Sequence, residues 1–116
     1  MPSPATFRAV FWLATVFAVA MAIVPQPPYT PVEEFGDKVE HIVAFATLAA
    51  LACLGFPQAA KRSIVERLSF LGAAIEVVQS IPALNRDCDV RDWLVDTATV
   101  ALVALAFAAW NKRRRA

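Results

Sequence analysis

Acidic, histidine and amide side chains recur at helical spacing in three segments: Asp37 and His41; Glu76 and Gln79; and Asp89, Asp92 and Asp96. Residues three, four or seven positions apart share one face of a helix, so each segment predicts one polar stripe. A histidine beside carboxylates can act in general acid–base catalysis, which makes His41, Glu76 and Asp92 the candidate catalytic residues. The chain has no Gly-rich phosphate loop and no recognisable Ser or Cys nucleophile, so enzyme and binding protein both stay open.

The same residues suggest two kinds of ligand. Lys38 and Arg86 could hold an anionic group such as phosphate, Arg86 through its bidentate fork, although the excess of acids opposes a strongly anionic ligand. The predicted ligand-binding residues are Asp37, Lys38, Gln79, Arg86, Asp89 and Asp96. Alternatively, one histidine and several carboxylates suit a divalent metal such as Mg, Mn or Zn. The candidate metal ligands are His41, Glu76, Asp89 and Asp92.

Four apolar runs must position these side chains, over residues 7–24, 37–56, 63–81 and 92–110. Each is about long enough to cross a bilayer as a helix, and none shows the alternation typical of strands. Hydrophobic residues make up 59% of the chain and charged residues only 18%, which exceeds what a soluble domain of 116 residues can bury. The sequence therefore predicts an all-α membrane bundle of four transmembrane helices.

The basic residues indicate the orientation of this bundle. One side collects eight of the 11 Lys and Arg residues: Arg8, Lys61, Arg62, Arg67, Lys112, Arg113, Arg114 and Arg115. Because positive charge favours the cytoplasmic side, both termini should be cytoplasmic and the polar stripes should face outward. A rival interpretation of the first run is a cleaved signal peptide, since Ala18–Ala22 offers small residues at A-x-A spacing; we expect a retained helix.

Depth makes two of the acids informative. Glu76 lies roughly 7 Å inside the Pro82 boundary of its run, and Asp96 about one turn inside the start of the fourth run. Ionisable groups at such depth cost several kcal/mol unless they face a protein interior or a wet cavity. The positions therefore predict a polar pocket that opens to the outer side.

Simpler roles stand beside this pocket for several residues. Asp89 or Asp92 could be the N-cap of the fourth helix, and Lys38 could be an interfacial lysine. The run from Lys112 to Arg115 is expected to anchor the helix at anionic lipid, not to bind nucleic acid. The polar residues as a whole could form an interhelical network with a purely structural role in a scaffold protein.

The order of these residues resembles the VanZ-like family of small bacterial membrane proteins, whose pattern reads D-K-x-x-H, E-x-x-Q and R-x-x-D-x-x-D-x-x-x-N-x-x-G. The matching positions are Asp37, Lys38, His41, Glu76, Gln79, Arg86, Asp89 and Asp92. Two positions depart from the pattern, because Asp96 stands for the Asn and Thr99 for the Gly. The resemblance covers Asp37 to Trp110.

The resemblance implies a single domain over 1–116, multi-pass in the bacterial cytoplasmic (inner) membrane. The predicted pocket opens outward, where cell-envelope lipids and precursors present their headgroups, so we expect a site that binds or acts on such a headgroup. The family's namesake is associated with resistance to the glycopeptide teicoplanin. The expected partners are membrane lipids and such a ligand, without nucleic acid, and the only cofactor suggested is a divalent metal. The sequence indicates neither the ligand nor the oligomeric state.

Overall fold

The described part of the chain is helical. A computed structural model describes residues 2–24, 31–84 and 90–115, with side chains for 2–24, 39–83 and 90–114. These ranges form α1 (Pro4–Ile23), α2 (Pro31–Gly55), α3 (Lys61–Gln79), the short 3-10 helix η1 (Pro82–Leu84) and α4 (Val90–Arg115). They contain no strand, which confirms the all-α prediction.

The helix ends follow local sequence signals, and some differ from the predicted ends. Ser3 caps α1 by accepting from the Thr6 N–H, and Pro4 occupies the first turn, where its missing N–H costs nothing. Helix α2 begins at Pro31 instead of 37, because a proline is equally well suited to the first turn of this helix. Helix α4 ends at Arg115 instead of 110, since basic side chains favour a helix C-terminus.

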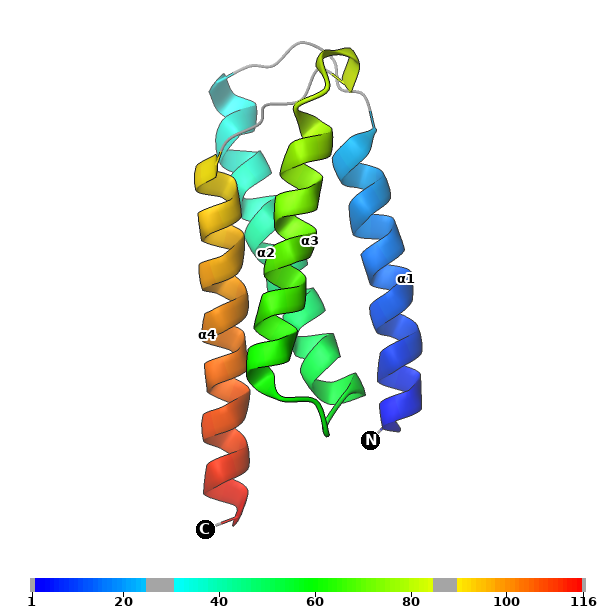
Figure 1. Ribbon diagram of the computed structural model, residues 1–116, viewed down its shortest axis with the longest axis vertical. Coiled ribbons are helices and arrows are strands. Elements are labelled where there is room, and N and C mark those ends of the chain that lie inside the picture. The colour runs from blue at the N-terminus through cyan, green and yellow to red at the C-terminus, as the bar shows by residue number, and fades with distance from the viewer. Residues whose placement is uncertain (1, 25–30, 85–89, 116) are drawn as a thin grey trace.

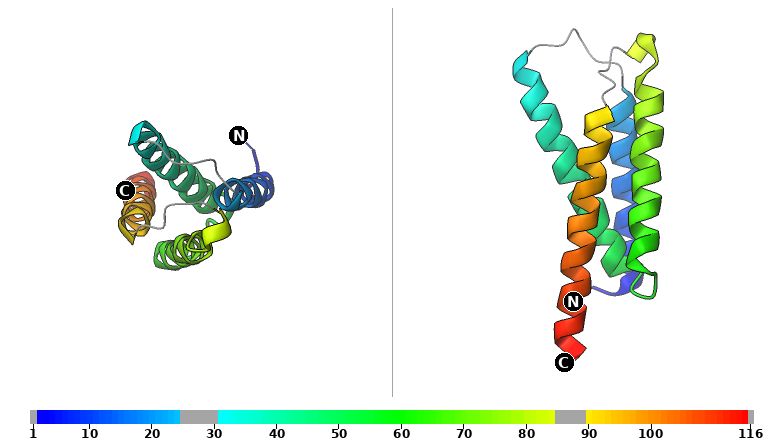
Figure 2. Two further views of the ribbon diagram at one scale, coloured as in Figure 1. Left: turned by 90° about the horizontal axis from the view of Figure 1, so that it is seen from above. Right: turned by 60° about the vertical axis from the view of Figure 1, so that its left-hand side comes forward.

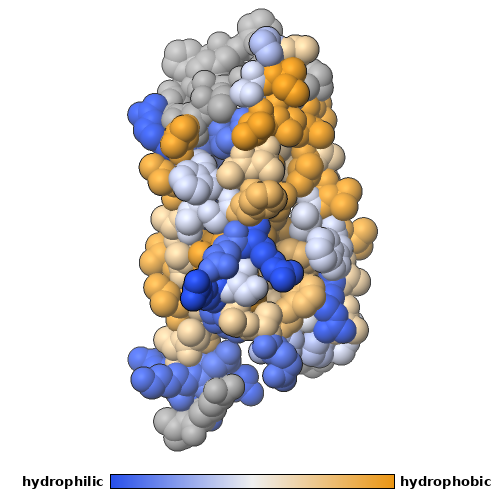
Figure 3. Space-filling model, in the orientation of Figure 1, coloured by the Kyte–Doolittle hydropathy of each residue, from blue (hydrophilic) through white to orange (hydrophobic). Residues whose placement is uncertain are grey.

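Consecutive helices run in opposite directions, as Figure 1 shows. The start of α1, the connection between α2 and α3, and the end of α4 therefore lie at one end, which we call the basic end. It carries the described side chains of Arg8, Lys61, Arg62, Arg67, Lys112, Arg113 and Arg114. In Figure 3 hydrophilic residues gather at this end, below a mostly hydrophobic surface that a hydrophilic patch interrupts in its lower half.

Helix α2 supplies half of the buried residues of the described core. Its buried residues are Phe45, Leu48, Ala49, Ala52 and Cys53, which pack against Phe11 of α1, Ile64, Leu68 and Ile75 of α3, and Val100 of α4. Two alanines in this group allow the helix backbones to approach closely, as small residues do between membrane helices. The core thus connects all four helices of the described ranges.

Helices α1 and α2 are closest at the basic end. A Cβ atom at Gly55 would lie 2.9 Å from the backbone nitrogen of Arg8, so only glycine permits this approach. Arg8 also donates from Nη1 to the Gly55 carbonyl over 2.9 Å. Toward the opposite end α2 tilts, and its Pro31 end diverges from α1 in both views of Figure 2.

Large hydrophobic side chains cover much of the outside. Leu13 of α1 is 72% exposed, and Phe70 of α3 and Leu102 of α4 are similarly open. Within the described ranges, Pro4–Ile23 and Val90–Arg114 are long and apolar enough to cross a membrane, and Val39–Gly55 is a shorter apolar helix. Helix α3 has 19 residues but is less apolar, because Glu66, Arg67 and Glu76 lie among its hydrophobic residues.

Candidate functional site

Three ionisable side chains from three helices converge in the half of the bundle away from the basic end. They are His41 of α2, Glu76 of α3 and Asp96 of α4, and one nitrogen or oxygen atom from each lies within 4.8 Å of the other two. Glu76 is 7% exposed and Asp96 only 1%, whereas the His41 side chain is 13% exposed. We call these residues the polar triad.

His41 and Asp96 are in direct contact. The Nδ1 atom of His41 lies 3.3 Å from Oδ2 of Asp96. When Nδ1 carries the hydrogen, this N–H group donates a hydrogen bond to the carboxylate, which fixes the orientation of the ring and its tautomer. The buried aspartate therefore orients the one triad residue that has appreciable exposure.

Packing between α3 and α4 holds Asp96 in place. Trp93 donates from Nε1 to the Ser69 carbonyl over 3.0 Å, and the hydroxyls of Ser69 and Thr97 lie 2.9 Å apart. Gly72 of α3 leaves room beside this contact, because a Cβ atom there would lie 3.4 Å from Trp93 and 3.6 Å from Oδ2 of Asp96. Asp96 is thus supported on both sides by residues that join the same two helices.

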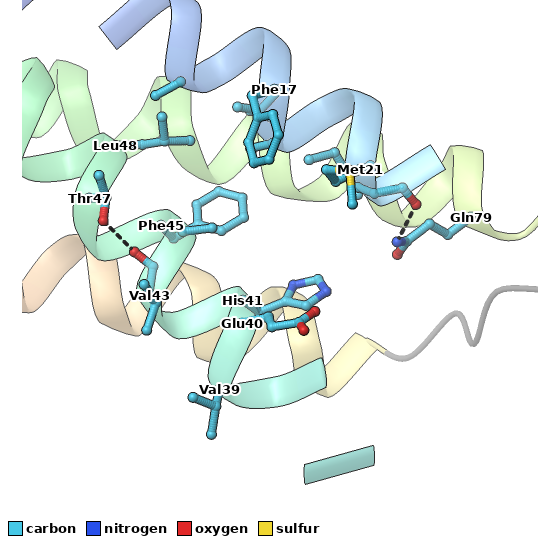
Figure 4. Close-up of a pocket in the computed structure, with 16 residues that line it drawn as sticks. Phe17, Met21, Val39, Glu40, His41, Val43, Phe45, Thr47, Leu48 and Gln79 are labelled. Atoms are coloured by element: carbon cyan, nitrogen blue, oxygen red, sulfur yellow. Dashed lines mark hydrogen bonds between the residues drawn. The ribbon is translucent and has the colours of Figure 1, made fainter. Parts of the chain in front are cut away.

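Gln79 joins α3 to α1. It is 4% exposed, and its Nε2 donates to the Ala22 carbonyl over 2.9 Å. The last carbonyls of a helix have no partner within that helix, so Gln79 satisfies one of them from a neighbouring helix. This bond, drawn in Figure 4, gives a residue predicted to bind ligand a structural contact.

A cavity of about 550 Å³ opens where α2 diverges from α1. Its polar lining comes mainly from His41, Glu40 and Gln79 at one end, where Figure 4 shows His41 and Gln79. The rest of the lining is mostly apolar: Ala14, Phe17, Ala18, Met21, Ala22, Val39, Val43, Ala44, Phe45, Thr47, Leu48, Leu71 and Ile75. His41 is the triad residue that borders this first cavity.

Comparison with known proteins gives no match: no protein-family model, curated protein or solved structure resembles this chain. The chemistry of the site therefore follows from its own residues.

A second cavity of about 440 Å³ lies between α1 and α3, nearer the basic end, and includes Arg67 and Ala74 in its lining. Neither His41, Glu76 nor Asp96 borders it, which makes it a natural control.

The predicted site residues fall into three groups. His41, Glu76 and Asp96 come together, and Gln79 lies beside the first cavity. Asp92 is buried, at 6% exposure, one turn before Asp96, but is outside the triad. It lies in the first turn of α4, which begins at Val90, so Asp92 is not the N-cap, and the alternative that Asp89 is the N-cap lies outside the described residues. The remaining candidates lie outside the described side chains: Asp37, Lys38, Arg86 and Asp89.

Sequence reasoning missed the residues that support the triad. Gly72 had a visible signal, because a glycine within an apolar helix often lies at a contact between two helices, although a Cβ atom here would meet only ordinary contacts from 3.4 Å. Ser69, Trp93 and Thr97 had none, since each is an ordinary residue of an apolar helix until its partner on the other helix is known. The arrangement as a whole offers one imidazole and two buried carboxylates, which can transfer protons or bind a cation.

Proposed function

We propose that this chain is an integral membrane protein with four membrane-spanning helices that binds an amphiphilic lipid, with its apolar chain in the first cavity and its headgroup beside His41. The observation that carries this proposal is the joining of an apolar cavity to a polar triad through one shared residue. An amphiphile has the matching division into an apolar and a polar part. Ligand sites generally combine a mostly apolar lining with a few convergent polar groups.

The outer surface supports a membrane location. Exposed side chains such as Leu13, Phe70 and Leu102 would form unfavourable apolar patches in water but suit lipid. Two helices meet the length and hydropathy expected of a membrane span, and the basic end would lie on the cytoplasmic side. The proposed topology places both termini in the cytoplasm and the polar triad toward the outer side.

Contacts between α1 and the rest of the bundle favour a retained α1 over a cleaved signal peptide. Helix α1 forms one wall of the first cavity and supplies the Ala22 carbonyl to Gln79. The resemblance to VanZ-like proteins adds the cell envelope of a bacterium as the source of the lipid. A lipid or lipid-linked precursor of the envelope would meet an outward-facing site directly.

Lipid retention by the purified protein tests the proposal. Ala18 lines the first cavity and Ala74 the second, so Ala18→Trp and Ala74→Trp fill different cavities with the same side chain. Native mass spectrometry of protein purified in mild detergent should detect bound lipid. Ala18→Trp should lower the affinity for that lipid about tenfold or more, an effect of about 1.4 kcal/mol. Ala74→Trp should retain it.

A second candidate function is a helical scaffold, and the interhelical hydrogen bonds favour it. Gln79 to Ala22 and Trp93 to Ser69 each join two helices without requiring a ligand. The same experiment separates the two functions. Equal lipid content in wild type, Ala18→Trp and Ala74→Trp, all helical by circular dichroism, would refute lipid binding in the first cavity and leave the scaffold.

A further inference from the structure

We propose that His41, Glu76 and Asp96 bind one divalent cation of the Mn²⁺ or Zn²⁺ class. The set differs from the metal site that the sequence suggested, since Asp96 takes the place of Asp89 and Asp92. The site stands on the geometry of the polar triad alone. Its role in holding a headgroup rests on the proposed function.

The donor atoms lie near the spacing that such an ion requires. One imidazole nitrogen and two carboxylate oxygens form an open set that leaves positions for water or ligand. Around an ion bound at about 2.0–2.2 Å, two donors are at most about 4.4 Å apart. The triad donors lie within 4.8 Å of one another, so small side-chain rotations would complete the site.

The two buried carboxylates of the triad favour a bound cation. Glu76 and Asp96 bring two carboxylates into the interior from neighbouring helices. The 3.3 Å contact between Nδ1 of His41 and Oδ2 of Asp96 already brings a nitrogen and an oxygen donor together, and the ion would replace the proton between them.

The surroundings suit a fixed metal site. All three ligands lie on helices, and the contacts of Trp93, Ser69 and Thr97 join the helices that carry Glu76 and Asp96. Rigid elements hold ligand atoms more accurately than loops do. A bound cation would also put positive charge at the polar end of the first cavity, beside His41. It would thereby favour an anionic headgroup, such as a phosphate, because the positive charge offsets the repulsion from the nearby carboxylates.

Metal titration of the intact protein tests this site. Protein purified in detergent and freed of metal with a chelator is dialysed against Mn²⁺ or Zn²⁺. We expect one ion per chain, with affinity reduced tenfold or more in Glu76→Gln and in Asp96→Asn. Glu66→Gln is the matched control, because Glu66 is 60% exposed and paired with Arg62 at the basic end. It should bind as wild type does.

Two further measurements keep the outcome decisive. If the triad variants lose helicity, the ¹⁴N coupling in the electron spin echo spectrum of Mn²⁺-loaded wild type decides, because a His41 ligand must produce it. No stoichiometric binding by wild type, no nitrogen coupling, or equal loss in Glu66→Gln overturns the metal site. Lipid content is measured in the same samples. Lipid without metal refutes only the metal site, and metal without lipid refutes only the proposed function.

Discussion

Replacing Gln79 with leucine should loosen α1 from the bundle without changing the shape of the site greatly. Gln79 is 4% exposed and donates to the Ala22 carbonyl over 2.9 Å, so leucine removes the partner of a carbonyl at the end of α1. Interhelical hydrogen bonds in membrane proteins contribute about 0.6 kcal/mol on average and up to about 1.7. A carbonyl left unsatisfied in a buried place costs about 1–3 kcal/mol. We therefore expect a loss of about 1–2 kcal/mol.

Reversible unfolding in mixed micelles measures this loss. Gln79→Glu sharpens the test, because an ionised carboxyl cannot donate to the Ala22 carbonyl and also adds negative charge at a helix C-terminus. Its loss should exceed that of Gln79→Leu at neutral pH and shrink in acid, where the protonated carboxyl can donate. Gln58→Leu, at an exposed position between α2 and α3, should stay within about 0.5 kcal/mol of wild type. Equal stability of Gln79→Leu and wild type would refute the reasoning.

Two other contacts give predictions with controls inside the chain. Gly55→Ala should cost about 1–3 kcal/mol of unfolding free energy, because its Cβ would lie 2.9 Å from the backbone of α1. Gly72→Ala meets only ordinary contacts from 3.4 Å and should cost less than about 1 kcal/mol. Equal costs for the two variants would contradict the close approach of α1 and α2 at Gly55. Trp93→Phe should cost about 1 kcal/mol through the lost bond to a carbonyl of α3, while Trp110→Phe, at a position 59% exposed, should leave unfolding unchanged.

The all-α class and the polar stripes that carry the triad residues could be anticipated, because both depend on local spacing. Apolar runs of helical length predict helices, and His41, Glu76 and Asp96 each belong to a polar stripe on one helix face. Stripes cannot say which turn of one helix meets which turn of another. Asp92 and Asp96 are one turn apart on the same face, and only the packing of α4 against α3 places Asp96 beside His41.

Other features depend on contacts that a single sequence does not reveal. The partner of Gln79 is a backbone carbonyl, which any residue of α1 could have supplied. The first cavity lies where α2 diverges from α1. The two helices are in close contact at Gly55 and separate toward the opposite end. Helix α2 begins at Pro31, whereas the predicted start at 37 follows the apolar run alone. Proline is well suited to a first helical turn and lets the helix begin earlier.

The position of α1 makes the two proposals separable. Helix α1 lines the first cavity, whereas the three triad residues lie on α2, α3 and α4. Arg8 joins α1 to Gly55 at the basic end, and Gln79 joins it to α3 at the other end. Gln79→Leu should therefore weaken lipid retention while metal affinity stays near that of wild type. Loss of both would mean that α1 holds the triad together, contrary to the contacts described above.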